Sequence, residues 1–454
     1  MRFQRLLTYV LILSMALPLP AQFGGGKPPP LAASSSWGFT LFPFSLVLIP
    51  LLIAWMVDYT SRPSDIESER RRRVDPVLIA LTALVVLSVV SCVLNHADYR
   101  AASMWLSLTG LYAFARYRMP RIIGREQLAV ALACVLVGLA LLSGVQVLTG
   151  RAVGAVATFF QKQVRTSQVY GGNGGGGLFK RVQGTFFSTD VFAMFLLYNA
   201  IWLIGVTRSV KGRLIAWSLG LCGVLIALTF SRGVWATSLV VVPLILLTFV
   251  RRRLMRLSRL LGFFLVLIVV AGLAFVLAAG TIFARLQATQ VSTSAQTRDT
   301  ANQVAICLIE VRPLWGVGAN AMVVQQHIGN CDRFGNDIRA HNIYLQDWAE
   351  QGIFVLLAYL AVGLLMIREA VRKRRLDDVG ARSMRTSVVF MVIAWLFFML
   401  VYATANDYNV MPIWILLGGY SLTMLDTSRK VVEPLGRAAP FALSALRPPE
   451  YAHV

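Results

Sequence analysis

The strongest constraint on the fold is a series of long apolar runs separated by polar segments. Runs of roughly 17–25 apolar residues are long enough to cross a bilayer as helices. Hydrophobic residues make up 57% of the 454-residue chain and charged residues only 14%, more apolar surface than a soluble domain buries. We therefore predict an all-α polytopic membrane protein of about twelve spanning helices, at 5–21, 37–58, 76–96, 101–117, 127–148, 188–206, 213–230, 233–250, 259–282, 351–367, 386–404 and 411–425.

The basic residues predict the orientation of these helices. The chain has 43 Lys and Arg against 21 Asp and Glu, a formal charge of +22. With a cytoplasmic N-terminus, 30 of the 43 basic residues fall on the cytoplasmic side of the twelve-span arrangement and 13 on the outer side. Short cytoplasmic loops carry an excess of Lys and Arg. The basic excess is thus an orientation signal that predicts two cytoplasmic termini, and it requires no nucleic-acid partner.

The chain shows no second soluble domain and no fixed-period repeat. We predict one transmembrane bundle over 1–425 and a loosely ordered cytoplasmic tail over 426–454, which is polar and punctuated by proline. The first 23 residues also resemble a signal peptide, because Arg2 and Arg5 precede an apolar run. We favour a retained first helix, since no clear small-x-small cleavage site follows.

Two longer segments are predicted to face away from the cytoplasm. The segment 149–187 contains the glycine-rich run 171–177, which is typical of a flexible connector. The segment 283–350, between spans nine and ten, is the larger and carries helical patterning, so we expect a structured cap. Its apolar residues at helical spacing predict an amphipathic helix that ends near Pro313; they are Ala301, Val304, Ala305, Leu308 and Ile309.

The rest of the larger segment contains a turn and the start of another helix. Gly316 and Gly318 allow a tight turn after Pro313. A second helix is predicted to begin around Asn342 and to continue into the span at 351–367.

Two of the five cysteines, Cys307 and Cys331, lie in this larger segment. On an oxidising side of the membrane they form a disulfide worth about 3 kcal/mol, or they remain two unpaired thiols. Cys92, Cys134 and Cys222 lie in predicted spans, where a small buried apolar residue is the default interpretation.

His341 is the best placed of the four histidines for chemistry. It lies in the sequence Arg339-Ala340-His341-Asn342, at the mouth of a predicted membrane helix. Histidine is the side chain that most readily takes a proton near neutral pH. The alternative interpretation is a hydrogen-bonded histidine at a loop–helix junction.

Three outer arginines break the orientation rule at notable positions. Arg232 occupies a very short turn between two apolar spans, Arg298 begins the amphipathic helix, and Arg181 precedes the span at 188–206. A guanidinium offers two parallel donors, which suit a diphosphate. The alternative is an arginine that extends to the lipid headgroups.

Other chemistries have less support in the residues. The outer segments contain no Asp-x-Asp pair, no His-x-x-x-His and no Cys/His cluster, so we expect no metal or other cofactor. A transporter would place polar residues at mid-span, whereas polar residues here gather at the outer ends of the spans. An interfacial site is therefore favoured over one at the bilayer midplane.

Several short motifs follow one another on the predicted outer side. They are Arg181-Val182-Gln183-Gly184-Thr185-Phe186, Ser231-Arg232-Gly233, Arg298, Pro313-Leu314-Trp315-Gly316-Val317-Gly318, His341-Asn342 and Glu350-Gln351-Gly352. In this order the motifs resemble the O-antigen ligase and O-antigen polymerase superfamily of bacterial inner membranes, over about 181–367. After Gly-Thr-Phe the family often continues Asn-Pro-Asn, where this chain has 187–190 as Phe-Ser-Thr-Asp.

The resemblance implies a GT-C-like glycosyltransferase of lipopolysaccharide biosynthesis. Such an enzyme transfers polysaccharide from undecaprenyl diphosphate to lipid A–core at the periplasmic face of the inner membrane, with inversion and without a metal. An O-antigen polymerase or a protein O-oligosaccharyltransferase is the alternative. The short C-terminal region favours the ligase, because the protein transferases carry an additional C-terminal region.

The resemblance also implies roles for individual residues. His341 becomes the general base, and Arg232, Arg298 and Arg181 become the diphosphate ligands. The supporting residues are Asn342, Arg339, Gly316 and Gly318.

Overall fold

The computed structural model describes most of the chain. The described residues are 2–16, 21–23, 39–41, 43–60, 75–97, 99–149, 182, 184–186, 189–206, 212–229, 231–251, 290–319, 321–322, 325–334, 340, 342–372, 379–401 and 411–438. Their helices are α1 (Arg2–Met15), α2 (Pro43–Thr60), α4 (Pro76–Leu94), α5 (Arg100–Tyr117), α6 (Met119–Ile122), α7 (Arg125–Thr149), α9 (Thr189–Val206), α10 (Gly212–Thr229), α11 (Arg232–Arg251), α13 (Gln290–Val311), η1 (Ile328–Phe334), α14 (Ile343–Gln351), α15 (Ile353–Arg372), α16 (Val379–Val401) and α17 (Met411–Ala438).

Six of the described helices are long and apolar enough to cross a membrane: α4, α7, α9, α10, α15 and α16. Shorter apolar stretches occupy α1, α2 and α11. Each predicted span overlaps a helix except the one at 259–282, which lies outside the described residues. The protein is thus a helical membrane protein, and the number twelve stays a prediction.

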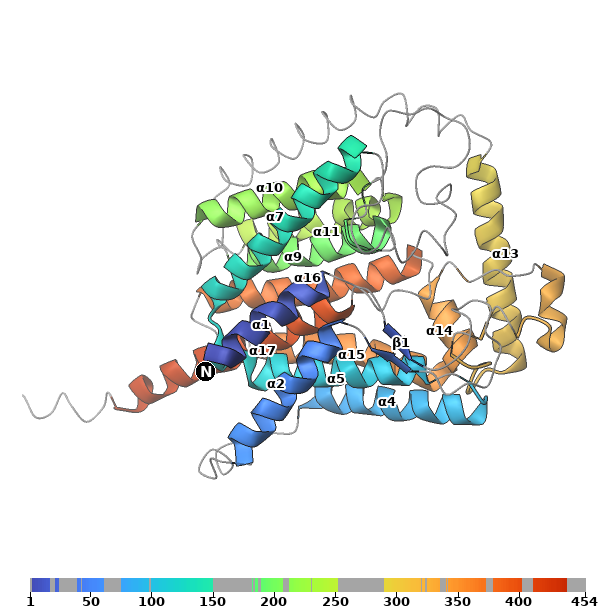
Figure 1. Ribbon diagram of the computed structural model, residues 1–454, viewed down its shortest axis with the longest axis horizontal. Helices are drawn as coiled ribbons and strands as arrows, with labels where there is room; N and C mark the ends of the chain where they lie inside the picture. Colours follow the sequence, from blue (N-terminus) through green and yellow to red (C-terminus); the bar gives the residue numbers. More distant parts are fainter. Residues whose placement is uncertain are drawn as a thin grey trace, which may run out of the picture.

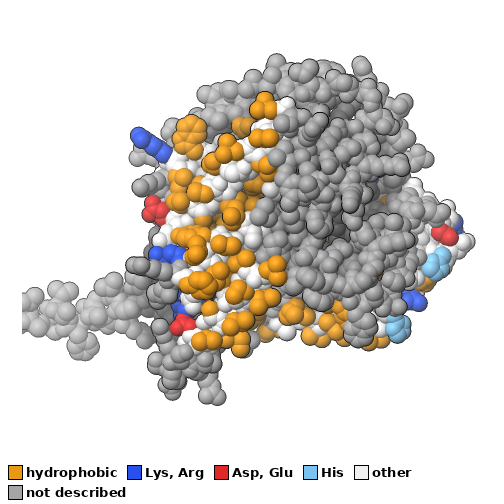
Figure 2. All heavy atoms as spheres, in the orientation of Figure 1, with side chains coloured by type: hydrophobic (Ala, Val, Ile, Leu, Met, Phe, Trp, Pro, Cys, Tyr) orange, Lys and Arg blue, Asp and Glu red, His pale blue; other side chains and the backbone are white. Residues whose placement is uncertain are grey.

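The surface of the bundle is apolar where a bilayer would surround it. Figure 2 shows a broad hydrophobic band between charged side chains at the left edge and charged and histidine side chains at the right. Trp217 on α10 and Leu239 on α11 are 81% and 74% exposed. Apolar surface this extensive is unusual for a soluble monomer and is expected of helices that contact lipid.

Helix α9 forms the centre of one half of the bundle. It is buried over nearly its whole length and packs against α10 and α16. A Cβ added at Gly205 would overlap the Ser387 hydroxyl, so the glycine permits the close approach of α9 and α16. Trp202 also donates from Nε1 to Ser421 Oγ at 3.1 Å, which ties α9 to α17.

A buried polar network ties together the helix ends near the N-terminus. Asp75 caps α4 by accepting from Val77 N at 2.9 Å, and it pairs with Arg116 Nε of α5 at 3.1 Å. Arg116 also pairs with Asp426 of α17 at 2.6 Å. Burial of the arginine is tolerated because each charge has a partner. Arg118 bonds Gln4 of α1, so this is the end at which the chain begins.

Helix α13 runs across the opposite end of the bundle, beside α14 (Figure 1). The predicted amphipathic face is confirmed, because its five apolar residues are buried while Asp299, Gln303 and Glu310 are exposed. The helix begins at Gln290, not at Arg298 as predicted. Its first turns are polar and carry no apolar periodicity, so the pattern revealed only the second half of the helix.

Two strands of three residues each accompany the helices, and the fold remains consistent with an all-α membrane protein. β1 (Ala21–Phe23) and β2 (Phe39–Leu41) pair antiparallel, with Gln22 opposite Thr40. The first two predicted spans, 5–21 and 37–58, included parts of both strands. Pro18 and Pro20 follow α1 in the sequence and disfavour its continuation, and Pro43 begins α2, where a proline is well tolerated.

The last helix also differs from its prediction. α17 continues to Ala438, beyond the predicted end of the span at 425. Arg429, Lys430 and Glu433 are good helix formers, which accounts for the extension of the helix into polar sequence.

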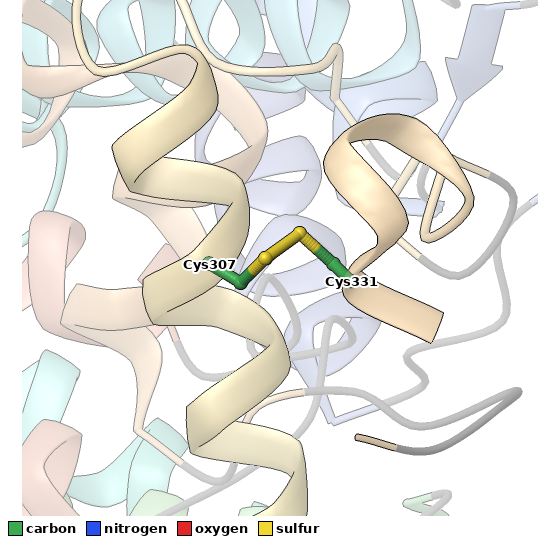
Figure 3. Close-up of a disulfide and its surroundings, with 2 residues drawn as sticks. All are labelled: Cys307 and Cys331. Carbon is green, nitrogen blue, oxygen red and sulfur yellow. A yellow bond between two sulfur atoms is a disulfide. The ribbon is translucent and has the colours of Figure 1, made fainter. Parts of the chain in front are cut away.

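The disulfide that the sequence left open is formed. Cys307 of α13 and Cys331 of η1 are bonded, with their Cα atoms 5.7 Å apart (Figure 3). Both cysteines are buried beside Val304 and Leu308. The bridge therefore fastens η1 to the inner face of α13, and it excludes the alternative of two unpaired thiols.

Reduction of this bridge is expected to destabilise the α13 region. The bridge closes a loop with a sequence separation of 24 residues, and a bridge of that size contributes about 3 kcal/mol. Thermal unfolding of the purified protein in detergent, with and without reductant, measures the effect. Cys134→Ala, which removes an exposed free thiol, is the control and should not change the transition. An unchanged transition after verified reduction would contradict the prediction.

Candidate functional site

The segment from Arg312 to Gly318 lies against the end of α4 that is remote from the N-terminus. Ser91 Oγ and Asn95 Nδ2 both donate to the Trp315 carbonyl, at 2.8 and 3.0 Å. Arg312 Nη1 donates to Asn95 Oδ1 at 3.0 Å. Three polar side chains thus hold a segment that follows α13 against the membrane bundle.

The same segment is bonded to the end of α14. Val317 N donates to the Ala349 carbonyl at 2.9 Å, and Gly318 N donates to the Glu350 carbonyl at 2.7 Å. Gly316 and Gly318 have φ values of 66° and 109°, so the predicted tight turn is confirmed. A Cβ at Gly316 would overlap the Glu350 carbonyl. Glycine is therefore required here both for the backbone conformation and for the close contact.

Helix α14 begins where the sequence predicted. Asn342 is its N-cap, and its Oδ1 accepts from Tyr344 N at 2.9 Å and Leu345 N at 3.4 Å. An asparagine in this position satisfies amide groups that the first turn leaves free. The cap fixes the backbone immediately after His341.

The predicted continuation of this helix into the next span is wrong. Gly352 separates α14 from α15 with φ 86° and ψ 171°. A Cβ at this position would overlap the Leu314 carbonyl. Ile353 N and Trp348 Nε1 both donate to the Pro313 carbonyl, at 3.1 and 2.9 Å. The break therefore lets α14 turn and fasten the segment that follows α13.

One face of α14 carries polar side chains into the protein interior. Gln346, Glu350 and Gln351 are each at most 3% exposed. Ser88 of α4 donates to Gln351 Oε1 at 3.0 Å. Within the part of the chain that the structure describes, Gln346 Oε1 and Gln351 Nε2 have no hydrogen-bond partner. Burial of polar groups without hydrogen-bond partners costs free energy. These buried side chains therefore lower the stability of the folded protein.

A second group of motif residues lies where α9 and α11 begin. The side chain of Gln146 on α7 makes two hydrogen bonds with the backbone of Gly184. It donates to the glycine carbonyl at 2.6 Å and accepts from the glycine N–H at 3.1 Å. Val182 N donates to the Leu228 carbonyl at 3.2 Å. Ser231 donates to Asp190. The structure thus places Val182 and residues 184–186 beside the turn that leads into α11.

Residues 216–360, from α10 into α15, match a family model described as O-Antigen ligase. The match supports the O-antigen ligase superfamily for this segment. Members of the family are glycosyltransferase- or ligase-type membrane enzymes, and their substrates are in general lipid-linked glycans. No curated protein matches the chain.

The O-antigen ligase segment contains most of the predicted site residues. His341, Arg339 and Arg181 lie outside the described residues. Arg232 is the first residue of α11, and Arg298 is exposed on α13. The structure brings Gly316, Gly318 and the Asn342-capped helix together, as the contacts above show. The roles of the histidine and the arginines stay predictions.

The described residues contain no group of three or more His, Cys, Asp or Glu side chains that could hold a metal ion. The expectation that transfer needs no metal stays a prediction, which the chelator experiment below tests.

Sequence reasoning missed Asp347 of α14, which lies six residues after His341 in the sequence. Burial and the nearby Glu350 carboxylate raise the pKa of Asp347 to about 8. A carboxyl group with a pKa near neutrality can hold or release a proton under working conditions. The signal was present, because Asp347 and Glu350 are three apart on a helix that opens directly after the candidate histidine.

The raised pKa predicts how stability changes with pH. The folded protein keeps the Asp347 proton at pH values where the unfolded chain has released it, so stability falls as pH rises from the ordinary value of 3.8 towards 8. Asp347→Asn removes this penalty. The variant should gain thermal stability over the parent protein, and the gain should be larger at pH 8 than at pH 5.

Asp299→Asn, at an exposed position on α13, is the matched control and should show no such trend. Equal differences between Asp347→Asn and the parent at both pH values would refute the prediction. Scanning fluorimetry in detergent provides the measurement.

Proposed function

We propose that this protein is an O-antigen ligase. It transfers polysaccharide from undecaprenyl diphosphate to lipid A–core at the periplasmic face of the bacterial inner membrane. The observation that carries the proposal is the position of the family segment. The segment contains α11, which begins at Arg232, α13, which includes Arg298, and α14, which begins after the Asn342 cap.

The proposed reaction needs one base and several cations. The acceptor sugar hydroxyl attacks the anomeric carbon of the donor, and His341 takes the hydroxyl proton. The bond from that carbon to the diphosphate oxygen breaks, and undecaprenyl diphosphate leaves. Arg232, Arg298 and Arg181 offset the charge that grows on the diphosphate. Attack from the side opposite the leaving group inverts the anomeric centre.

The structure supports an active site at the membrane surface. α13 crosses the end of the bundle, and the segment Arg312–Gly318 is bonded to α4 and α14. This arrangement forms a cap under which two lipid-anchored substrates can approach from within the bilayer. The N-terminal end of the bundle, with its Arg116 and Arg118 network, is then the cytoplasmic end, as the positive-inside rule requires.

Reconstitution tests the proposal. Purified protein in liposomes is supplied with undecaprenyl-diphosphate-linked glycan and lipid A–core, with and without a chelator. Ligase activity gives glycan-bearing lipid A–core that depends on both substrates and survives chelation. Longer donor chains without an acceptor would indicate a polymerase. Glycan on an acceptor protein would indicate a protein transferase. Movement of the donor with no new glycosidic bond would overturn the enzymatic proposal in favour of transport.

A further inference from the structure

A cavity with a volume of 680 Å³ lies between α1 and α7. Its walls are apolar for most of their length and include Ile12 and Leu13 of α1 and Val130 and Val135 of α7. Among the described residues that line it, the polar ones are Tyr9, Glu126, Gln127 and Thr185. The volume is within the range of ligand sites in proteins, about 300–1,000 Å³.

The cavity follows the length of a membrane helix. Its lining on α7 extends from Glu126 to Leu142, which is about 24 Å along the helix axis at about 1.5 Å per residue. The hydrocarbon core of a bilayer is about 30 Å thick. The cavity is therefore a groove that crosses most of the hydrocarbon region.

Lining residues of the groove on both α1 and α7 are exposed. A Cβ added at Gly138 would meet no atom within 4 Å. Leu13 and Val130 are 52% and 43% exposed. An unfilled space forfeits dispersion contacts, and at this depth the material available to fill it is hydrocarbon. An apolar groove at this depth is suited to a lipid chain.

One end of the groove leads to the proposed diphosphate site. Thr185 lines the groove and donates to the carbonyl of Ala16, which also lines it. The preceding residue, Gly184, accepts a hydrogen bond from Gln146 through its carbonyl. Val182 N donates to the carbonyl of Leu228, near the start of α11. A chain in the groove therefore ends beside Gly184 and Thr185, close to the turn that leads into α11.

We propose that this groove binds the polyprenyl chain of the lipid-linked donor. The inference rests on the proposed function, because the diphosphate site at the end of the groove selects a chain that carries a diphosphate over a bulk phospholipid. A chain held along α7 fixes the direction in which its diphosphate enters the site.

Photocrosslinking tests the inference directly. A diazirine-bearing undecaprenyl diphosphate is added to the full-length protein in phospholipid nanodiscs, and the crosslinked peptides are identified by mass spectrometry. Crosslinks should concentrate on α1 and α7 and should be competed by unlabelled undecaprenyl diphosphate but not by added phospholipid. Crosslinks spread over the lipid-facing helices, or equal competition by phospholipid, would overturn the proposal.

A pair of variants on one helix provides the second test. Gly138→Phe fills the groove, whereas Gly144→Phe does not, although Gly144 also has open space at its Cβ and does not line the groove. Gly138→Phe should remove the crosslinks to α7 and raise the KM for the donor about tenfold, the effect of losing the burial of roughly two methylene groups. Gly144→Phe should match the parent protein. Parent-like crosslinking by Gly138→Phe would contradict the proposal.

The two proposals fail differently. Crosslinks confined to α1 and α7 without glycan transfer would retain the groove and reject the ligase. Transfer to lipid A–core with crosslinks elsewhere would retain the ligase and reject the groove.

Discussion

Replacement of His341 by alanine is expected to lower glycan transfer by about 10²–10⁴-fold, the usual contribution of a general base. The acceptor hydroxyl then has no group to take its proton as it attacks. The donor should still bind, because the proposed diphosphate ligands are arginines. The loss should therefore appear in kcat with little change in the KM for the donor. The measurement is the rate of lipid A–core glycosylation in liposomes.

His327→Ala is the matched control for this experiment. His327 is an exposed histidine just before η1, in the same segment between α13 and α14. It has no proposed part in the reaction, so its replacement should leave transfer close to the parent rate. Thermal unfolding of both variants checks that the fold is retained. Normal attachment of glycan by His341→Ala would remove the histidine from the mechanism.

Gly352→Ala is expected to destabilise the site more than any other small substitution considered. The φ of 86° and ψ of 171° form a conformation that is essentially restricted to glycine, and a non-glycine residue there costs roughly 1–3 kcal/mol. The added Cβ would also overlap the Leu314 carbonyl, so the segment after α13 must shift. We expect a lower unfolding temperature together with a loss of transfer.

Gly220→Ala on α10 is the control, because a Cβ at Gly220 meets nothing within 4 Å. Alanine favours a helix over glycine by up to about 1 kcal/mol, so this variant should be as stable as the parent or slightly more stable. If Gly352→Ala unfolds at the parent temperature, the close contact at the α14–α15 break is not needed for stability.

Local sequence was sufficient for the position of most helices and for the cap of α14. The apolar runs predicted the spanning helices because a bilayer requires each segment to satisfy its own backbone hydrogen bonds. The 3.6-residue period predicted the buried face of α13. Asn342 predicted the start of α14, because its side chain bonds amide groups within the next three residues. Each of these features depends on residues that are close together in the chain.

Other features depended on contacts between distant segments. The break at Gly352 exists because the Leu314 carbonyl occupies the space of a Cβ, which no local pattern reports. The pKa of Asp347 is raised by burial and by the Glu350 carboxylate, and burial depends on how the whole chain packs. The pairing of Cys307 with Cys331 required α13 and η1 to pack together. The groove between α1 and α7 is a space between two helices that are more than a hundred residues apart in the chain. The sequence by itself therefore determined which segments are helical and where polar chemistry gathers, because those properties follow from neighbouring residues. Tertiary structure alone decided where the helix breaks, which carboxyl group has a raised pKa and where the groove lies, because each depends on atoms brought together from distant parts of the chain.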